Sequence, residues 1–204
     1  MKIAIIDYGM GNIHSVSKAI ELCGAKPIIT NKAGQLNSCK KIVLPGVGAF
    51  DDAVAELEKL GLISVLKEEI KNKKPFLGIC LGMQLLFETS QEAKSKEGLG
   101  VLKGQVVKFS VKLGQKIPHM GWNNLEDVSS ICSLLKGINV KEQVYFCHSY
   151  YPEPVDKDIV AASCDYGVKF ACVLARDNIY GVQFHPEKSQ TAGLKIIKNF
   201  VELC

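Results

Sequence analysis

Short apolar runs alternate with amphipathic helical patterns through the first half of the chain. The runs with the length and composition of strands buried on both faces are residues 3–6, 26–30, 39–44 and 76–79. Apolar residues recur at helical spacing over 13–23 and over 54–70, where Gly61 interrupts the pattern and predicts two short helices or one broken helix. This alternation predicts a doubly wound, mostly parallel central sheet flanked by helices, with its active site at the carboxyl ends of the strands.

The second half has a different texture. Its β-branched and aromatic residues form short runs, and no long helical pattern occurs until residues 194–204. The runs are residues 105–109, 144–147, 159–164, 168–175 and 179–184. Short turns at residues 165–167 and 177–178 separate the last three, which is typical of an antiparallel meander. We therefore expect an additional antiparallel β section in the second half.

Composition narrows the class of protein without identifying it. At 204 residues, with 47% hydrophobic and 23% charged residues, the chain suits a single domain spanning residues 1–204. The net charge of +4 comes mainly from scattered lysines, and Arg176 is the only arginine. A nucleic-acid groove needs clustered basic residues between aromatic ones, so we expect no nucleic-acid partner.

Cysteine usage and the N-terminal residues indicate a cytoplasmic protein. The eight cysteines include no C-x-x-C pair, so we interpret them as reduced thiols and not as a disulfide or zinc framework. Residues 1–7 form too short an apolar run for a signal peptide, and no stretch approaches the length of a membrane span. We expect neither a membrane partner nor a metal site.

One cysteine occupies a position that suits a nucleophile. Cys80 lies between an apolar run and a helical pattern that begins at residues 83–87, and Gly78 and Gly82 flank it. This G-x-C-x-G layout is that of a nucleophile elbow, where small neighbours allow a strained turn and a helix N-terminus favours the thiolate. The N–H of Leu81 is then placed to stabilise an oxyanion. A core cysteine in a strand-to-helix turn explains this motif alone equally well.

Two glycine-bearing loops follow other strands. Residues 45–48 end the third strand, and backbone N–H groups at Gly46, Val47 and Gly48 can supply a second oxyanion donor. A plain strand-to-helix turn is the alternative for this loop. Residues 7–12 contain G-x-G without the third glycine of a dinucleotide-binding loop, so we expect no cofactor there.

A thiolate nucleophile needs a proton shuttle, and His185 is the best placed of four histidines. It ends an apolar strand, which puts it at the same sheet edge as Cys80. Glu187, two residues later, can fix the tautomer and orientation of the His185 ring. The three side chains would form a nucleophile, a base and an orienting carboxylate. A structural turn histidine is the alternative for His185.

Taken together, these motifs resemble those of the class I (triad) glutamine amidotransferases. The motifs that carry this resemblance are residues 45–48, 78–84 and 184–187. The motifs that further resemble the glutaminase subunits of imidazole glycerol phosphate synthase are residues 7–12, 118–123 and 185–189. The resemblance covers essentially the whole chain and implies a flavodoxin-like amidotransferase fold without a cofactor.

The resemblance also implies a reaction and a substrate pocket. Cys80 would attack the side-chain amide of glutamine, and His185 would protonate the departing ammonia and then activate water. The residues implied for the oxyanion hole are Val47, Gly48 and Leu81. The residues implied for glutamine binding are Gly46, Gln84, His148, Ser149 and Tyr150. For His148 and Tyr150, packing at a strand end is the alternative.

Ammonia needs a sealed path to an acceptor, and no acceptor-binding domain is left in this chain. The resemblance implies a heterodimer with a (βα)8-barrel cyclase subunit, which makes imidazole glycerol phosphate and an aminoimidazole carboxamide ribonucleotide. The implied docking residues are Asn12, Ser15, His119, Met120, Gly121, Trp122, Asn123 and Lys188. Trp122, the only tryptophan, suits an interface anchor, with a core residue of a β-ribbon as the alternative. We expect the free subunit to be a poor glutaminase, because similar proteins complete the oxyanion hole at residues 45–48 only with partner and ligand.

Other functions remain open from the sequence. A paralogous subunit would use the same triad to supply ammonia to a nucleotide-sugar or surface-sugar synthase. A non-enzymatic module on a flavodoxin-like sheet would use Cys80 as a redox sensor, although such a sensor has no need of Glu187. The motifs at residues 7–12 and 118–123 fit the anthranilate and guanylate amidotransferases less well.

Overall fold

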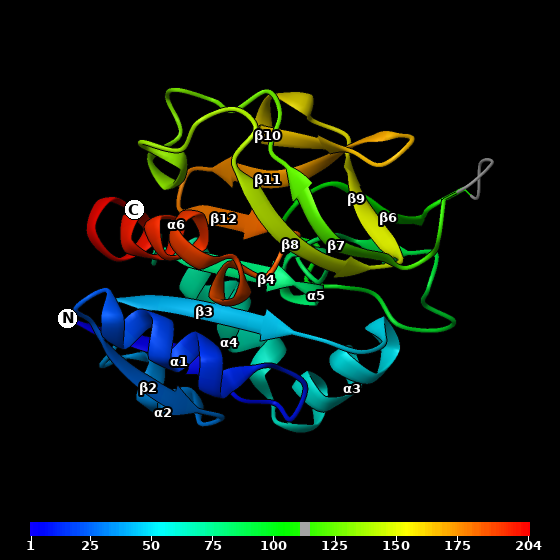
Figure 1. Ribbon diagram of the computed structural model, residues 1–204. Helices are drawn as coiled ribbons and strands as arrows, with labels where there is room; N and C mark the ends of the chain where they lie inside the picture. The colour runs from blue at the N-terminus through cyan, green and yellow to red at the C-terminus, as the bar shows by residue number, and fades with distance from the viewer. Residues whose placement is uncertain (111–114) are drawn as a thin grey trace.

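The structure, a computed structural model, describes residues 1–110 and 115–204. A seven-stranded sheet in the order β10-β11-β12-β4-β3-β1-β2 forms its centre (Figure 1). The strands of this sheet are β1 (Lys2–Ile6), β2 (Lys26–Thr30), β3 (Lys41–Gly46), β4 (Phe76–Cys80), β10 (Val160–Asp165), β11 (Lys169–Arg176) and β12 (Ile179–Val182). The five strands from β12 to β2 are parallel, and β11 and β10 continue the sheet antiparallel. The predicted mostly parallel sheet is confirmed.

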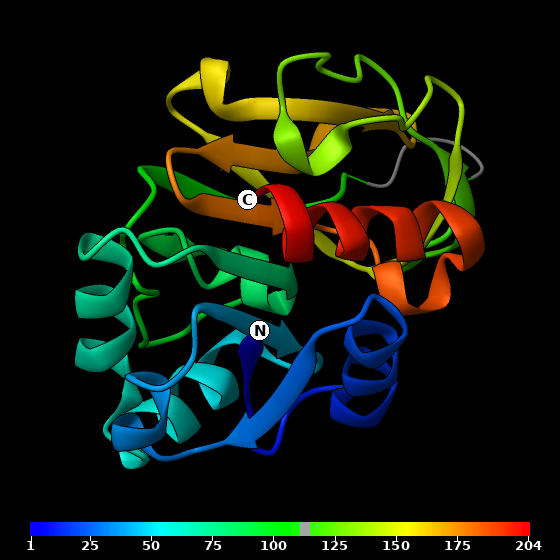
Figure 2. The same cartoon turned by 90° about the vertical axis from the view of Figure 1, so that its left-hand side faces the viewer.

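Helices cover both faces of the sheet because its central strands are apolar on both sides. Alternate residues of β1 enter two different cores: Ile3 and Ile5 join the cluster with α1 and α6, whereas Ala4 and Ile6 join the cluster with α3 and α4. Figure 2 shows these two helix pairs on opposite sides of the sheet. The long helices are α1 (Ile13–Leu22), α3 (Phe50–Lys59), α4 (Leu62–Lys71) and α6 (Gln190–Leu203); α2 (Ala33–Leu36) is a single turn.

The interruption predicted at Gly61 separates two helices. Gly61 has φ of +67°, a left-handed conformation that glycine adopts without a Cβ penalty, and it lies between the end of α3 and the start of α4. In the second half, the predicted meander is also confirmed, because β10, β11 and β12 pair antiparallel in sequence order. Since β12 is parallel to β4, the meander extends the central sheet.

Two smaller sheets complete the second half. One has the order β5-β6-β9 and the other is the β7-β8 hairpin (Figure 1). The strands are β5 (Thr89–Ser90), β6 (Gly104–Lys108), β7 (His119–Asn124), β8 (Gln143–His148) and β9 (Tyr150–Pro154). Three short 3₁₀ turns are η1 (Ser133–Leu135), η2 (Lys157–Ile159) and η3 (Pro186–Lys188). Within residues 1–110 and 115–204, no helix is both long enough and apolar enough to cross a lipid bilayer.

The prediction of a helix that begins at residues 83–87 was wrong. Helix α5 covers only Leu81–Gln84. The next carbonyls are used elsewhere: Leu85 accepts from the N–H of Leu99 at 2.7 Å, and Phe87 accepts from that of Gly100 at 3.1 Å. A returning segment 13 or 14 residues later therefore takes the hydrogen bonds that would have prolonged the helix.

The glycines beside Cys80 are required by close backbone packing. A Cβ on Gly82 would lie 1.8 Å from the carbonyl oxygen of Leu44 in β3, and one on Gly78 would lie 2.5 Å from the carbonyl oxygen of Gly82. These neighbours are backbone atoms, which cannot move away as a flexible side chain can. The turn between β4 and α5 is thus wedged against β3.

We expect Gly82→Ala to lower the free energy of unfolding by about 3 kcal/mol, because the added methyl group overlaps the backbone of β3. Gly34→Ala is the matched control: Gly34 lies in α2 with no atom within 4 Å of the added Cβ, so its change should be near zero or slightly stabilising. Urea unfolding of both variants measures the difference. Equal stabilities would show that the turn is not tightly packed.

Candidate active site

Cys80 sits on strained backbone at the end of β4. Its φ of +53° and ψ of −110° lie in a region that side-chain-bearing residues rarely adopt. The residue is 6% exposed and is the register partner of Gly46 in the neighbouring strand β3. The elbow predicted from the sequence therefore holds the sulfur beside the loop that follows β3.

His185 and Glu187 reach the same edge because β12 runs parallel to β4. His185 comes three residues after β12, and its Nδ1 lies 3.0 Å from Oε1 of Glu187. The side chain of Glu187 is 1% exposed, and Asn12 donates from Nδ2 to the same Oε1 at 3.3 Å. Oε2 of Glu187 is buried and has no hydrogen-bond partner among the described residues. Such a desolvated carboxylate is best balanced by a protonated imidazole.

The charge state of His185 follows from its neighbours. Burial by itself lowers the pKa of His185, but hydrogen bonds to Cys80 and Glu187 and the negative charges of both outweigh burial and raise the pKa to about 10. The imidazolium form is therefore favoured at neutral pH. With Nδ1 on Glu187, the second ring nitrogen carries its proton toward the sulfur.

Helix α5 stabilises negative charge on the sulfur less than the sequence suggested. A helix of one turn, Leu81–Gln84, has a small dipole, since the macrodipole grows with the number of aligned peptide units. The sulfur instead has a side-chain donor: Gln183 Nε2 lies 3.6 Å from Cys80 Sγ. Gln183 is completely buried, and sequence reasoning did not single it out.

A cavity of about 260 Å³ opens onto the sulfur. The predicted site residues that line it are Val47, Gly48, Cys80, Leu81, Gln84, His148, Ser149, Tyr150, His185 and Lys188. Gly46 and Glu187 are not part of the lining: Gly46 is the register partner of Cys80 in β3, and Glu187 contacts Nδ1 of His185. The structure thus brings the predicted triad and most of the predicted glutamine-binding residues to one cavity.

Four further residues at the site were missed, of which Cys147 is part of the cavity lining. Glu92 lines the cavity and accepts the N–H of Phe50 at 3.0 Å; burial raises its pKa, and that hydrogen bond opposes the rise. Pro118 also lines the cavity. Tyr8 is buried beside residue 46, with no partner for its hydroxyl among the described residues, and burial and the nearby Cys80 raise its pKa. Tyr8 belongs to the motif at residues 7–12, but that motif does not indicate that the ring reaches the sulfur, and no local motif surrounds Glu92. Only the fold reveals the two positions.

The two predicted oxyanion donors differ in availability. Leu81 begins α5, so its N–H has no acceptor within the helix. The N–H of Val47 donates to the carbonyl of Met10 at 3.1 Å. Gly48, which follows Val47, has a φ of +98°, a left-handed conformation that glycine adopts without a Cβ penalty. The Val47 donor is therefore committed to Met10 in this conformation.

The predicted docking residues fall into three groups, which are exposed, buried and half-buried. Met120 and Trp122 are 61% and 44% exposed, so Trp122 is not a core residue of the ribbon. His119, in contrast, is 2% exposed, and its ring stacks on Tyr166 at 4.0 Å. Its assignment to the docking surface was wrong, because residues along β7 alternate between the two sides of the hairpin and His119 points inward. Asn12, Ser15, Gly121 and Asn123 are half-buried, and Lys188 is exposed.

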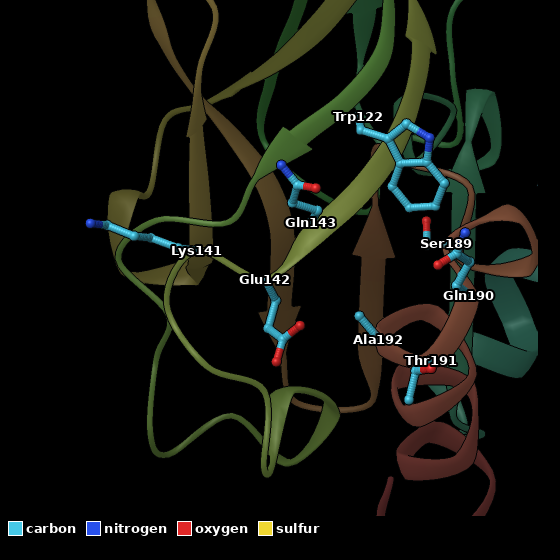
Figure 3. A pocket seen from close by; sticks show the side chains of 8 residues that line it. All are labelled: Trp122, Lys141, Glu142, Gln143, Ser189, Gln190, Thr191 and Ala192. Atoms are coloured by element: carbon cyan, nitrogen blue, oxygen red, sulfur yellow. The ribbon is translucent and has the colours of Figure 1, made fainter.

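A second cavity, of about 420 Å³, lies beside Trp122, one of the predicted docking residues, and not at the sulfur (Figure 3). It is lined by Trp122, by residues 141–143 before and in β8, and by residues 189–192 at the start of α6. It contains neither a thiol nor an imidazole. The chemistry of a Cys-His pair is therefore confined to the smaller cavity.

The chain resembles known amidotransferases along its whole length. The family model described as "Glutamine amidotransferase class-I" matches residues 4–204. Proteins named imidazole glycerol phosphate synthase subunit HisH are 49% identical in Synechocystis sp., over 98% of this chain and 95% of the relative, and 50% identical in Desulfitobacterium hafniense, over 97% and 92%. The chain belongs to the class I glutamine amidotransferases. Within this family, its relatives place it in the HisH group.

Solved structures of other glutamine amidotransferases share the fold. PurLQS from Thermotoga maritima has a TM-score of 0.77 at 19% identity and covers 98% of this chain and 97% of that one. The glutaminase domain of CTPS from Trypanosoma brucei has a TM-score of 0.67 at 17% identity, with coverage of 99% and 94%. At these identities the likeness shows the fold alone, and it confirms the predicted amidotransferase fold.

We expect this amidotransferase to lose stability as pH falls below about 6.5, because two buried histidines resist protonation. Burial lowers the pKa of His119 to about 4; burial, together with the nearby His119 and His185, lowers that of His148 to about 3. The unfolded chain binds both protons below about 6.5, so the free energy of unfolding should fall by up to about 1.4 kcal/mol per pH unit per histidine until the folded-state pKa values are reached.

Urea unfolding between pH 7 and pH 5 measures this slope. His119→Phe removes one of the two groups and should make the slope shallower by about one proton. Identical slopes in the native chain and the variant would show that His119 is protonated in the folded protein.

Proposed function

We propose that this chain is the glutaminase subunit of an imidazole glycerol phosphate synthase. It hydrolyses glutamine to glutamate and ammonia and passes the ammonia to a (βα)8-barrel cyclase subunit in histidine biosynthesis. The observation that carries the proposal is the meeting of Cys80 with the hydrogen-bonded His185–Glu187 pair in one cavity. The near full-length similarity to HisH proteins supports the choice of synthase.

The reaction proceeds in two halves at the Cys80 sulfur. The thiolate attacks the amide carbon of the glutamine side chain, and the carbonyl oxygen becomes an oxyanion held by backbone N–H groups. His185 gives its proton to the amide nitrogen, the C–N bond breaks, and ammonia leaves a glutamyl thioester. His185 then takes a proton from water, hydroxide displaces the sulfur, and glutamate departs. Glu187 keeps the ring oriented throughout.

Polar groups around the cavity suit the two ends of glutamine. Glu92 places a carboxylate on the lining, which complements the α-ammonium group. Gln84 already donates from Nε2 to the Tyr150 carbonyl and to Gln183 Oε1, so its own Oε1 is the atom left for substrate. Ser149 supplies a hydroxyl on the same lining.

The resting state of the oxyanion hole supports partner-dependent activity. Leu81 offers a donor at once, whereas the Val47 N–H is tied to Met10. Completing the hole requires this bond to break and the Gly46–Val47 peptide, which carries the Val47 N–H, to turn. We assign that step to docking of the cyclase subunit with its ligand, so the free chain works slowly. Loss of one oxyanion donor commonly lowers turnover by about a hundredfold or more.

The docking surface is assigned to the exposed side of the β7-β8 hairpin. Trp122 packs edge-on against Tyr145 with ring centroids 6.0 Å apart, and Lys188 Nζ lies 5.8 Å from the centre of the Tyr145 ring. A partly exposed tryptophan next to tyrosine and lysine is typical of an interface anchor. Lys188 also lines the cavity, which joins this surface to the site of ammonia release. A single domain over residues 1–204 and a cytoplasmic location complete the proposal.

We expect Cys80→Ala to lower glutamine-dependent synthesis in the complex by at least about a thousandfold, because no other nucleophile replaces the sulfur. Synthesis from added ammonium salts should remain, since the cyclase reaction needs only ammonia. Cys147→Ala is the matched control: Cys147 lines the same cavity but takes no part in the triad, so glutamine-dependent synthesis should continue.

The assay compares product formation with glutamine and with ammonium for both variants. Retention of glutamine-dependent synthesis by Cys80→Ala would refute the triad. If the native chain hydrolyses glutamine but supports no synthesis with the cyclase, its acceptor is another synthase, such as one that aminates a sugar.

A further inference from the structure

Two histidines in the core of the second half are not used by the proposed chemistry. His119 in β7 and His148 in β8 are 2% and 6% exposed and are register partners in the hairpin. The His119 ring is stacked between Tyr166 at 4.0 Å and Phe146 at 4.6 Å. Burial of two imidazoles is costly unless their nitrogens are hydrogen-bonded, so their partners need to be identified.

The bonds of the two histidines all run in one direction. Nδ1 of His148 lies 2.9 Å from the carbonyl oxygen of Tyr150, which can only accept, so Nδ1 carries the proton. Burial keeps both rings neutral, so Nε2 of His148 is an acceptor and takes the Nδ1–H of His119 at 3.1 Å. Nε2 of His119 then accepts from Asn123 Nδ2 at 3.3 Å.

The orientation of the Asn123 amide is set independently. Its Nδ2 also donates to the carbonyl of Asp165 at 2.8 Å, and its Oδ1 accepts the N–H of Asn124 at 2.8 Å. Both contacts require the amide to face as described. The polarity of the histidine pair therefore begins at a half-buried residue of β7 and ends at the Tyr150 carbonyl.

A second set of bonds joins this carbonyl to the nucleophile. Gln84 Nε2 donates to the Tyr150 carbonyl at 2.8 Å and to Gln183 Oε1 at 3.1 Å, which uses both of its protons. With its oxygen facing Gln84, Gln183 turns its NH₂ group to Cys80 Sγ at 3.6 Å. Each amide orientation is thus determined by the previous bond, from the carbonyl to the sulfur.

We propose that Asn123, His119, His148, Gln84 and Gln183 form one hydrogen-bonded relay, joined at the Tyr150 carbonyl, that positions an N–H on the Cys80 sulfur and links it to β7. The histidines and Gln183 are positioning residues. The proposal rests on the proposed function for its purpose, which is to hold the thiolate in a state that depends on the docking strand. The opposite side of β7 exposes Met120 and Trp122.

The stacked aromatic rings make the relay sensitive to movement of β7. His119 is confined between two rings and pairs with His148 across the hairpin, so a displacement of the strand moves both imidazoles together. The contacts at 3.1 and 3.3 Å are near the upper end of hydrogen-bond distances. A shift of a few tenths of an ångström at β7 is enough to weaken them.

Other groups near the sulfur define the background of the test. His185 and Tyr8 interact electrostatically with Cys80, and Glu92 and Lys188 line the same cavity. None of these side chains is a donor or acceptor in the relay, so substitutions within the relay leave them in place.

The test is the rate at which iodoacetamide alkylates Cys80 in the full chain as a function of pH, with the Cys80 peptide quantified by mass spectrometry. Gln183→Met removes the N–H on the sulfur and should raise the apparent pKa of alkylation by about one unit. His119→Phe keeps the ring stack but breaks the relay near β7. This variant should raise the apparent pKa of alkylation by about half a unit. His119→Gln, which can both donate and accept, should restore the native profile.

Tyr166→Phe is the matched control, because it keeps the ring that stacks on His119 and loses only a hydroxyl that donates to the Lys116 carbonyl. A native profile for Gln183→Met overturns the relay at the sulfur, and a native profile for folded His119→Phe overturns its link to β7. If Gln183→Met does not fold, Gln183→Asn, which is too short to reach the sulfur, carries the same expectation. Alkylation needs neither glutamine nor a partner, so it separates failure of the relay from failure of the proposed function.

Discussion

The site depends on the backbone of Cys80, which is held at positive φ where β4 meets α5. This conformation is unfavourable for a residue with a side chain, and it persists because the surrounding backbone leaves no room for another one. A Cβ on Gly82 would overlap the Leu44 carbonyl, and one on Gly78 would overlap that of Gly82. The packing that defines the core of the sheet thereby also directs the sulfur into the cavity.

The charged groups buried around the sulfur also define the site. Glu187 is desolvated and pairs with His185. Together, Glu187 and the sulfur keep the His185 imidazole protonated despite its burial. The Val47 N–H, however, is paired with Met10 and not directed at a substrate oxygen. The site therefore brings the Cys80 sulfur and a protonated imidazole together, while the Val47 N–H, the proposed second oxyanion donor, is bonded elsewhere. In the proposed function, this arrangement limits glutamine hydrolysis while no acceptor is docked.

Much of the fold could be predicted from the sequence because its signals are local. The apolar runs and the break at Gly61 each act within a few residues. The position of His185 followed from the general rule that parallel strands end at one edge of a sheet. The structure obeys this rule, because β12 pairs in parallel with β4. The prediction of a helix from residue 83 onward was wrong, because hydrogen bonds from residues 98–100 end α5 at Gln84. His119, Glu92 and Gln183 depend in the same way on partners far along the chain.

The most direct measurement is the rate of glutamine hydrolysis by the purified chain, alone and mixed with an imidazole glycerol phosphate synthase cyclase subunit, with and without the cyclase ligand. Because one oxyanion donor is tied to Met10, we expect slow hydrolysis by the chain alone and stimulation of about a hundredfold or more in the liganded mixture. Full-rate hydrolysis by the isolated chain would contradict the account, since the site would then need no partner to complete it.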